Sequence, residues 1–166
     1  MPRNISMALT TDAIRDRTKT VTRRTGWRFA KVGDLLWSVE KSQGLKKGER
    51  VFRLALIEVE SVRQERLDAL IHPGRYRKPA NYPWKEMAAE GLPDLSPGEF
   101  VERWVSRNGG TAMDEVTRIG FDYIPAWVPC PGGDGEFVCN IHGGHAAECP
   151  CPEAEDPFWG NVDPYE

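Results

Sequence analysis

Residues 17 to 24 read Arg-Thr-Lys-Thr-Val-Thr-Arg-Arg, and the interpretation of the chain begins with this stretch. Its threonines and valine are β-branched, so the segment is predicted to be extended. Lys19 and Thr22 lie here among Arg17, Arg23 and Arg24. Such a density of cations beside hydroxyl groups can hold the anionic part of a ligand, or can steady an oxyanion that forms during a reaction.

The charge of the chain is distributed unevenly. The net charge of the 166 residues is −3, but residues 1–53 contain 13 Lys or Arg and 5 Asp or Glu. Residues 54–166 contain 9 Lys or Arg and 20 Asp or Glu. A basic first third can attract a nucleotide or RNA in spite of the negative total. A solvated charged surface is the alternative, and the sequence leaves both open.

The composition is that of a soluble protein, with 40% hydrophobic and 28% charged residues. No apolar run approaches the roughly 20 residues that a membrane-spanning helix needs. The first residues also lack the apolar stretch of a secretory signal. We therefore expect a cytoplasmic protein without a membrane partner.

The pattern of apolar and breaker residues predicts an α+β domain over residues 1–124, built round a curved sheet or barrel with flanking helices. Residues 72–85 contain three prolines and are expected to form a loop or insert. Ser96, Pro97 and Glu99 form a strong helix-start signal. The expected helical segments are 8–16, 67–71, 86–90 and 96–106, and the expected extended segments are 19–24, 35–39, 51–62 and 116–124.

Residues 125–166 form an acidic tail rich in glycine and proline, which we do not expect to bury a core of its own. All four cysteines of the chain lie within residues 130–151. In a cytosolic protein, such clustering favours metal binding over disulfides. We predict a structural zinc site, for which four ligands are needed. A disordered tail, or a tail that docks a protein partner, is the alternative. The candidate ligands are Cys130, Cys139, His142, His145, Cys149 and Cys151.

The order of the first segments resembles the ASCH family. The quoted stretch follows a helix and precedes WRFAKVGDLLWSVE and a strand that ends in LIEVESV. Arg17, Lys19 and Arg24 occupy the family's Gly-x-Lys-x-x-x-x-Arg-like signature. The resemblance covers roughly residues 3–124 and is closest to phage and prophage versions with a Cys/His tail. It implies a compact β-barrel related to the RNA-binding PUA domains.

Some small ASCH proteins are amidohydrolases that remove the acetyl group from N4-acetylcytidine. The resemblance implies that Lys19, Thr22 and Glu90 would form such a triad, with no catalytic cofactor. One difficulty is geometric, since residues 19 and 22 of a regular strand point to opposite faces. A bulge or turn would be needed to bring the two side chains together.

The three residues are chemically suited to the reaction. Thr22 is a weak nucleophile unless a base takes its proton. Burial and neighbouring arginines would lower the pKa of Lys19 and let it act as that base. Glu90 could orient Lys19. The alternative is a solvated β-ribbon that contacts phosphates, with Glu90 merely an acid at a helix end.

Two further residues are candidates for ligand binding. Trp27 could stack on a base, although tryptophans more often fill a core. Glu40, at the end of a strand, could line the cleft. The leading hypothesis is therefore a nucleoside- or nucleotide-directed amidohydrolase. A module that binds RNA or a modified nucleic acid without catalysis is the rival hypothesis, and a protein that acts only through its tail is the third.

Overall fold

The computed structural model describes residues 2–47, 51–125, 127–129 and 137–139. The chain divides into two compact units, Met1–Ile124 and Pro125–Glu166. The described part of the second unit consists of strands β6 (Trp127–Pro129) and β7 (Phe137–Cys139), which pair antiparallel. In the described part of the chain, no helix combines the length and the apolar character required to cross a bilayer.

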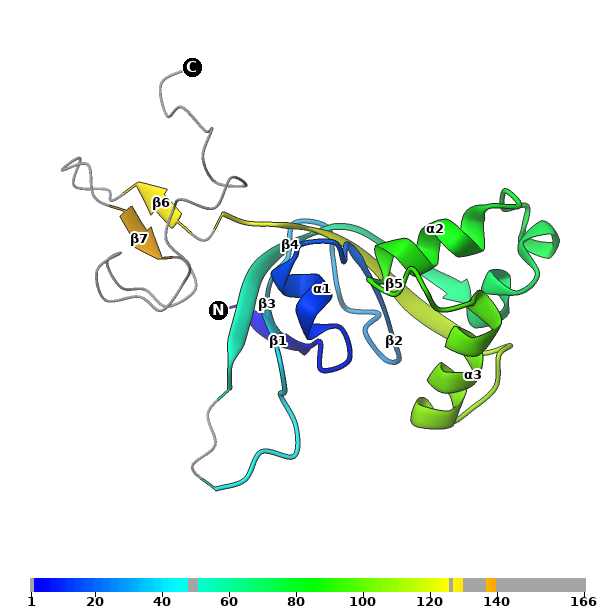
Figure 1. The fold of residues 1–166 in the computed structure, drawn as a ribbon, viewed down its shortest axis with the longest axis horizontal. Helices are drawn as coiled ribbons and strands as arrows, with labels where there is room; N and C mark the ends of the chain where they lie inside the picture. Colours follow the sequence, from blue (N-terminus) through cyan, green and yellow to red (C-terminus); the bar gives the residue numbers. More distant parts are fainter. Residues whose placement is uncertain (1, 48–50, 126, 130–136, 140–166) are drawn as a thin grey trace, which may run out of the picture. The chain divides into compact units, whose positions relative to one another are not determined.

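The first unit contains a five-stranded mixed sheet and helices, an α+β arrangement (Figure 1). The strand order is β1-β3-β4-β5-β2, and β1 and β3 are parallel while all other pairs are antiparallel. The strands are β1 (Arg3–Ser6), β2 (Val21–Arg24), β3 (Leu35–Val39), β4 (Arg53–Arg66) and β5 (Glu115–Tyr123). The helices are α1 (Thr11–Arg15), α2 (Tyr82–Ala89), α3 (Pro97–Asn108) and the 3-10 helices η1 (Leu67–Leu70) and η2 (Pro73–Tyr76).

The sheet curls so far that a side chain of one edge strand reaches the backbone of the other. A guanidinium nitrogen of Arg24 on β2 donates a hydrogen bond to the backbone carbonyl of Ser6 on β1. Helix α1 lies within the curve and buries Ile14 (Figure 1). A first apolar core fills the barrel, formed by Ile5, Met7, Ile14, Ala30, Leu36, Ala55, Ile57, Val59, Ile119 and Phe121.

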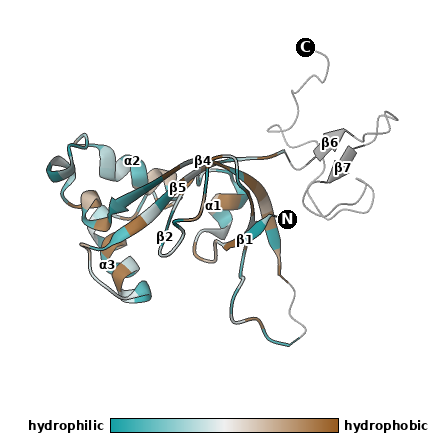
Figure 2. Ribbon diagram, turned by 180° about the vertical axis from the view of Figure 1, so that it is seen from behind, coloured by the Kyte–Doolittle hydropathy of each residue, from teal (hydrophilic) through white to brown (hydrophobic). Residues whose placement is uncertain are grey.

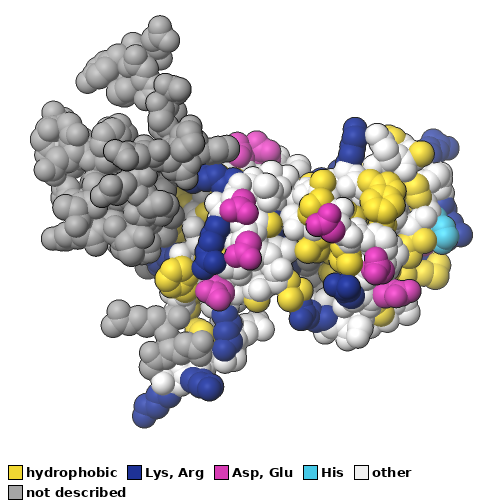
Figure 3. Space-filling view, in the orientation of Figure 1, with side chains coloured by type: hydrophobic (Ala, Val, Ile, Leu, Met, Phe, Trp, Pro, Cys, Tyr) yellow, Lys and Arg dark blue, Asp and Glu magenta, His cyan; other side chains and the backbone are white. Residues whose placement is uncertain are grey.

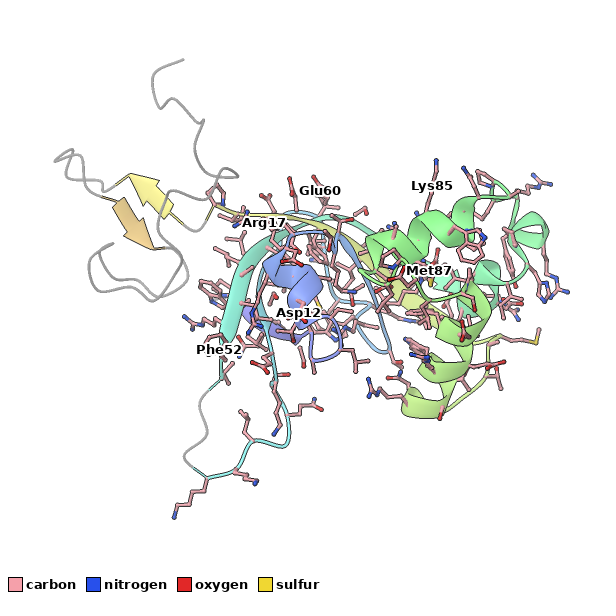
Figure 4. All side chains as sticks on the ribbon, viewed as in Figure 1. Asp12, Arg17, Phe52, Glu60, Lys85 and Met87 are labelled. Carbon is pink, nitrogen blue, oxygen red and sulfur yellow. The ribbon has the colours of Figure 1, made fainter. Side chains whose placement is uncertain are left out.

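A second apolar core lies beneath the helices. Strand β4 serves both cores, because Ile57 and Val59 belong to the barrel and the chain then runs on to Leu67. Hydrophobic residues along β4, β5 and α3 supply these cores (Figure 2), and Met87 of α2 is fully buried (Figure 4). The second core comprises Leu67, Leu70, Tyr82, Met87, Phe100, Val101 and Val116.

Local signals predict several elements well. Strand β3 has the expected bounds, and the capping box of α3 is confirmed. The Ser96 hydroxyl accepts a hydrogen bond from the Glu99 backbone at 3.3 Å, and the Glu99 carboxylate accepts one from the Ser96 backbone at 3.2 Å. Gly109 ends the helix, as predicted.

Other elements differ from the expectation. Strand β1 was not predicted, helix α1 is shorter than residues 8–16, and β4 extends to Arg66. The segment 72–85, expected to be a loop, contains η2 and the first half of α2. Two of its three prolines, Pro73 and Pro83, fall in the first turns of these two helices, where a missing backbone N–H costs nothing.

The chain just after α2 packs directly on the connection between α1 and β2, two residues beyond the last helical residue. Gly91 has a φ of 75°, in the left-handed region. A Cβ atom on this residue would lie 2.4 Å from the Cβ of Ala13 and 3.2 Å from the Cβ of Lys19. Glycine is thus required here twice, for its conformation and for its size. The close approach places the neighbouring Glu90 against Lys19.

We expect Gly91→Ala to lower the free energy of unfolding by about 2–4 kcal/mol, because left-handed backbone and overpacking both add cost. Gly98→Ala is the matched control, since a Cβ there meets nothing within 4 Å. Its effect should stay within about 1 kcal/mol. Urea denaturation measures both variants, and equal losses from the two would contradict this account of Gly91.

Candidate active site

A large groove runs over the first unit and contains the three residues of the predicted triad. Its volume is about 1380 Å³, and its lining includes Lys19, Thr22 and Glu90. Further lining comes from β1 and the residues that follow it, from the end of β2, from residues 41–43, from the segment before α3 and from α3 itself. On the face seen in Figure 3, hydrophobic side chains gather between the barrel and the helices, with charged side chains around them.

Lys19 lies in the turn before β2 and not within the strand. Its backbone N–H donates to the carbonyl of Ala13 at 3.1 Å, so α1 holds it. Its own carbonyl accepts a hydrogen bond from the Tyr123 hydroxyl at 2.6 Å. Strand β2 begins at Val21, two residues later. The strand alternation that would separate Lys19 from Thr22 therefore does not apply, and both side chains line the groove.

Lys19 and Glu90 form a buried pair. The Lys19 ammonium donates to a carboxylate oxygen of Glu90 and to the Glu90 backbone carbonyl, each at 2.7 Å. Their side chains are 3% and 4% exposed, so water screens the pair little. Burial lowers the pKa of Lys19; Glu90 opposes this, and the nearby charges of Arg24 and Arg23 lower it further. This is the direction that a general base needs.

Thr22 reaches the same groove from β2. It pairs with Ile119 across the strands, so its side chain faces the barrel side of the sheet. It is 3% exposed. Among the described residues no hydrogen bond occupies its hydroxyl, which lines the groove. A threonine in this position can offer its oxygen to a bound carbonyl carbon.

The opposite face of the sheet carries a row of arginines. Arg23 of β2 is in register with Arg118 of β5, and Arg118 is in register with Arg63 of β4. Directly opposed residues of antiparallel strands share a face, so three cations lie side by side. Like charges in such positions are destabilising unless anions lie between them.

Helix α2 supplies these anions. Tyr82, Glu86 and Glu90 are four residues apart, which places them on one stripe of the helix. Arg118 binds both oxygens of the Glu86 carboxylate, at 2.7 and 2.9 Å, and Arg23 also donates to Glu86. Arg23 donates to Glu90 at 2.9 Å. The arginine row and the α2 stripe thus interlock.

Glu65 of β4 completes the network. One of its oxygens accepts two hydrogen bonds from Arg23, at 2.9 and 2.7 Å. The other accepts from Tyr82 at 2.7 Å and from Arg63 at 3.1 Å. Arg63 also donates to the Tyr82 hydroxyl at 2.7 Å. Every acid of the network is therefore bonded to more than one donor.

The network keeps Glu65 and Glu86 ionised. Burial alone would raise the pKa of Glu65 and of Glu86. Arg23 and Tyr82 outweigh burial at Glu65, and Arg118 and Arg23 outweigh it at Glu86, so both pKa values end below the usual range. The pKa of Arg23 is raised, since its three carboxylates outweigh its own burial.

Three of the five predicted ligand-binding residues line the groove beside the triad, namely Arg23, Arg24 and Trp27. The Arg24 side chain is largely buried and bridges to Ser6, while its Nε has no partner among the described atoms. Trp27 packs on the barrel core, with its ring 5.1 Å from that of Phe29.

The other two predicted ligand-binding residues, Arg17 and Glu40, are not among the described residues that line the groove. Arg17 has a positive φ of 57°, and its guanidinium lies 5.3 Å from the ring centre of Tyr123. Glu40 is exposed at the end of β3, next to the groove residues 41–43.

Most of the predicted zinc ligands lie outside the described residues. Cys139 is the last residue of β7, opposite Trp127, and the other five candidates lie in residues that the structure does not describe. Within the described ranges, no group of three or more His, Cys, Asp or Glu is placed to hold a metal ion. The structural zinc site and a protein partner of the tail stay predictions.

Sequence reasoning missed the network around Arg23. Only the spacing of Tyr82, Glu86 and Glu90 carries a local signal, because it marks one face of a helix. Sequence reasoning also missed two exposed arginines of α3, Arg103 and Arg107. They are four residues apart and line the groove.

Comparison with known proteins gives limited similarity. No protein-family model matches the sequence, and a search of curated proteins found no match. Three solved structures are similar. The hypothetical protein PH0355 has 15% identity and a TM-score of 0.46, over 74% of this chain and 97% of its own.

The other two similar structures are ASCH proteins. The ASCH domain of Lactobacillus crispatus JV V101 has 15% identity and a TM-score of 0.46, over 73% of this chain and 78% of its own. A mutant of the Zymomonas mobilis protein ZmASCH has 17% identity and a TM-score of 0.45, over 74% of this chain and 70% of its own.

We expect Glu86→Gln to lower the free energy of unfolding at pH 7 by about 3–5 kcal/mol, because it leaves buried arginines short of an anion. The folded-state pKa of Glu86 is below its unfolded value. Its stabilisation is therefore present above the unfolded pKa, about 4.3, and is lost as the pH falls through the folded pKa. The difference between variant and parent should shrink over that acidic range.

The matched control is Glu102→Gln, the same change on the exposed side of α3. It should alter the free energy of unfolding by less than about 0.5 kcal/mol. Urea denaturation at a series of pH values measures both variants. A loss from Glu86→Gln that does not change with pH would contradict an ionic role.

Proposed function

We propose that this chain is an ASCH-type amidohydrolase that acts on a nucleoside or nucleotide, with N4-acetylcytidine as the model substrate. Lys19, Thr22 and Glu90 are the proposed catalytic residues. The observation that carries the proposal is the buried Lys19–Glu90 pair in a groove that Thr22 also lines. A buried lysine with a lowered pKa is a common way to obtain a base at neutral pH.

In the proposed reaction, the Thr22 oxygen attacks the carbonyl carbon of the amide while neutral Lys19 takes the hydroxyl proton. The tetrahedral intermediate bears a negative oxygen, and the neighbouring Arg24 guanidinium can stabilise it. Its collapse breaks the carbon–nitrogen bond, and Lys19 returns the proton to the leaving amine. Water then hydrolyses the threonine ester, again with Lys19 as the base.

Glu90 keeps the Lys19 amine in place throughout. In the structure it holds the ammonium through a carboxylate oxygen and the backbone carbonyl. The ionised carboxylate also stabilises the ammonium that forms when Lys19 takes the proton. Loss of Glu90 would thus affect both the position and the basicity of Lys19.

We expect Thr22→Val to reduce kcat/KM for N4-acetylcytidine by at least about 100-fold, and Lys19→Met to do the same, within the range of about 10²–10⁴ typical of acid–base groups. The parent activity should rise with pH and level off below about 10.4, the usual lysine pKa, because neutral Lys19 is the active form. Release of cytidine, followed by chromatography, is the measurement.

Thr25→Val is the matched control, since Thr25 lines the same groove but is exposed. It should retain most of the activity. Full activity of Thr22→Val would exclude Thr22 as the nucleophile. Absence of turnover by the parent at high enzyme concentration would remove N4-acetylcytidine as a substrate.

A specific observation also favours the rival function, binding of RNA without catalysis. The described groove lining holds six Lys or Arg and two Glu, although the chain as a whole carries a net charge of −3. Arg103 and Arg107 of α3 are exposed and lie one turn apart. Such an arrangement can follow the phosphates of a single strand.

Under this second function, we expect the double variant Arg103→Gln, Arg107→Gln to weaken binding of a short oligoribonucleotide. Two lost phosphate contacts should reduce the slope of log affinity against log salt by about 1.4. Fluorescence anisotropy over a salt series measures this slope for the parent and for the variant. The control, Lys31→Gln with Lys85→Gln, removes two exposed charges outside the groove lining, and Lys85 points away from the fold (Figure 4). Equal slopes for the two double variants would count against the groove.

A further inference from the structure

We propose that Arg23 is a positioning residue for the Lys19–Glu90 pair, and that it fixes one carboxylate oxygen of Glu90 so that the other faces Lys19. This inference deepens the proposed function and rests on it. Arg23 does not need to touch a substrate for this role, because it acts through Glu90.

The contacts assign a separate cation to each oxygen of Glu90. Arg23 Nη1 donates to Oε1 at 2.9 Å, and Lys19 Nζ donates to Oε2 at 2.7 Å. A carboxylate held at both oxygens cannot rotate about its last bond without losing a charge-assisted hydrogen bond. The orientation of Glu90 toward Lys19 is thereby determined by Arg23.

Arg23 is itself immobilised. Its Nε and Nη2 donate to Glu65, and its Nη2 also donates to Glu86. Its side chain is 0% exposed, and all three guanidinium nitrogens are engaged. Lysine at this position could not reproduce the arrangement, since an ammonium is a point charge without the planar fork.

Arg23 also connects two elements of the proposed triad. It follows Thr22 directly on β2, and successive strand residues point to opposite faces. Thr22 thus points to the barrel side while Arg23 binds Glu90 of α2 on the other side. The arginine fixes the helix that carries the acid relative to the strand that carries the hydroxyl.

The charged and polar groups around Lys19 determine what should change when the fork is lost. Glu90 faces it from α2, Arg23 and Arg24 act on it from β2, and the Tyr123 hydroxyl of β5 bonds its carbonyl. Arg23 draws on the negative charge of Glu90 that otherwise stabilises the Lys19 ammonium. Without the fork, Glu90 is free for Lys19 alone, and the pKa of Lys19 should rise.

The experiment compares Arg23→Lys and Arg23→Gln with Arg118→Lys. Arg118 is the matched control because it lies beside Arg23 in the row and binds Glu86, but has no hydrogen bond to Glu90 in the described structure. Lysine labelled with 13C at Cε reports the titration of each of the seven lysines by NMR. The Lys19 signal is identified by its absence in Lys19→Arg. We expect both Arg23 variants to raise the Lys19 midpoint, and Arg118→Lys to leave it unchanged.

Activity provides a second readout. For each unit that the Lys19 pKa rises, kcat near neutral pH should fall about tenfold with little change in KM. If the parent does not hydrolyse N4-acetylcytidine, the proposed reaction fails and the NMR titration alone decides the positioning role. An unchanged or lowered Lys19 midpoint in folded Arg23 variants would overturn the inference, as would an equal rise in Arg118→Lys.

Circular dichroism and thermal denaturation establish that each variant is folded. If Arg23→Lys does not fold, Glu65→Gln is added to it, because one oxygen of Glu65 accepts hydrogen bonds only from Arg23 among the described residues. The matched control is then Arg118→Lys with Glu65→Gln. The comparison of Lys19 midpoints and its two outcomes stay the same in this pair.

Discussion

The structure depends on the neutralisation of three arginines that the sheet forces side by side. Arg23, Arg118 and Arg63 are in register across β2, β5 and β4. The side chain of Arg23 is fully buried and that of Arg118 largely so, whereas Arg63 is 41% exposed. The two buried cations need anions, and Glu86 and Glu90 supply them. Exchanging a buried ion network for apolar residues is often neutral or stabilising, so its main effect here is on position and less on stability. It determines where α2 lies.

The position of Glu90 within the site depends in addition on close packing. The ionic network brings α2 to the sheet, and Gly91 lets the end of the helix approach Ala13 and Lys19 more closely than any side chain would permit. Glu90 precedes Gly91 in the chain and is bonded to Arg23 through one carboxylate oxygen and to Lys19 through the other. The proposed acid is therefore located by a long-range electrostatic contact and a short-range packing contact together.

The sequence predicts those parts of the fold that depend on neighbouring residues. The capping box at Ser96 and strand β3 arise from local patterns, and both are confirmed. Strand β1 has only four residues, too few for a recognisable period. The arginine row could not be foreseen, because residues 23, 63 and 118 become neighbours only through strand register, and a single sequence gives no information on register.

The proposed triad likewise combines a part that the sequence predicts with a part that only the structure shows. The sequence places Lys19 and Thr22 close together, and on a regular strand they would point apart. The turn that carries Lys19 removes this difficulty, since α1 and Tyr123 hold its backbone before β2 begins. Strand alternation applies from Val21 onward, so Thr22 faces the barrel side of the sheet and Arg23 faces α2. The arginines of the opening stretch therefore do not act as one cluster, because Arg23 binds three carboxylates while Arg24 binds the backbone of β1.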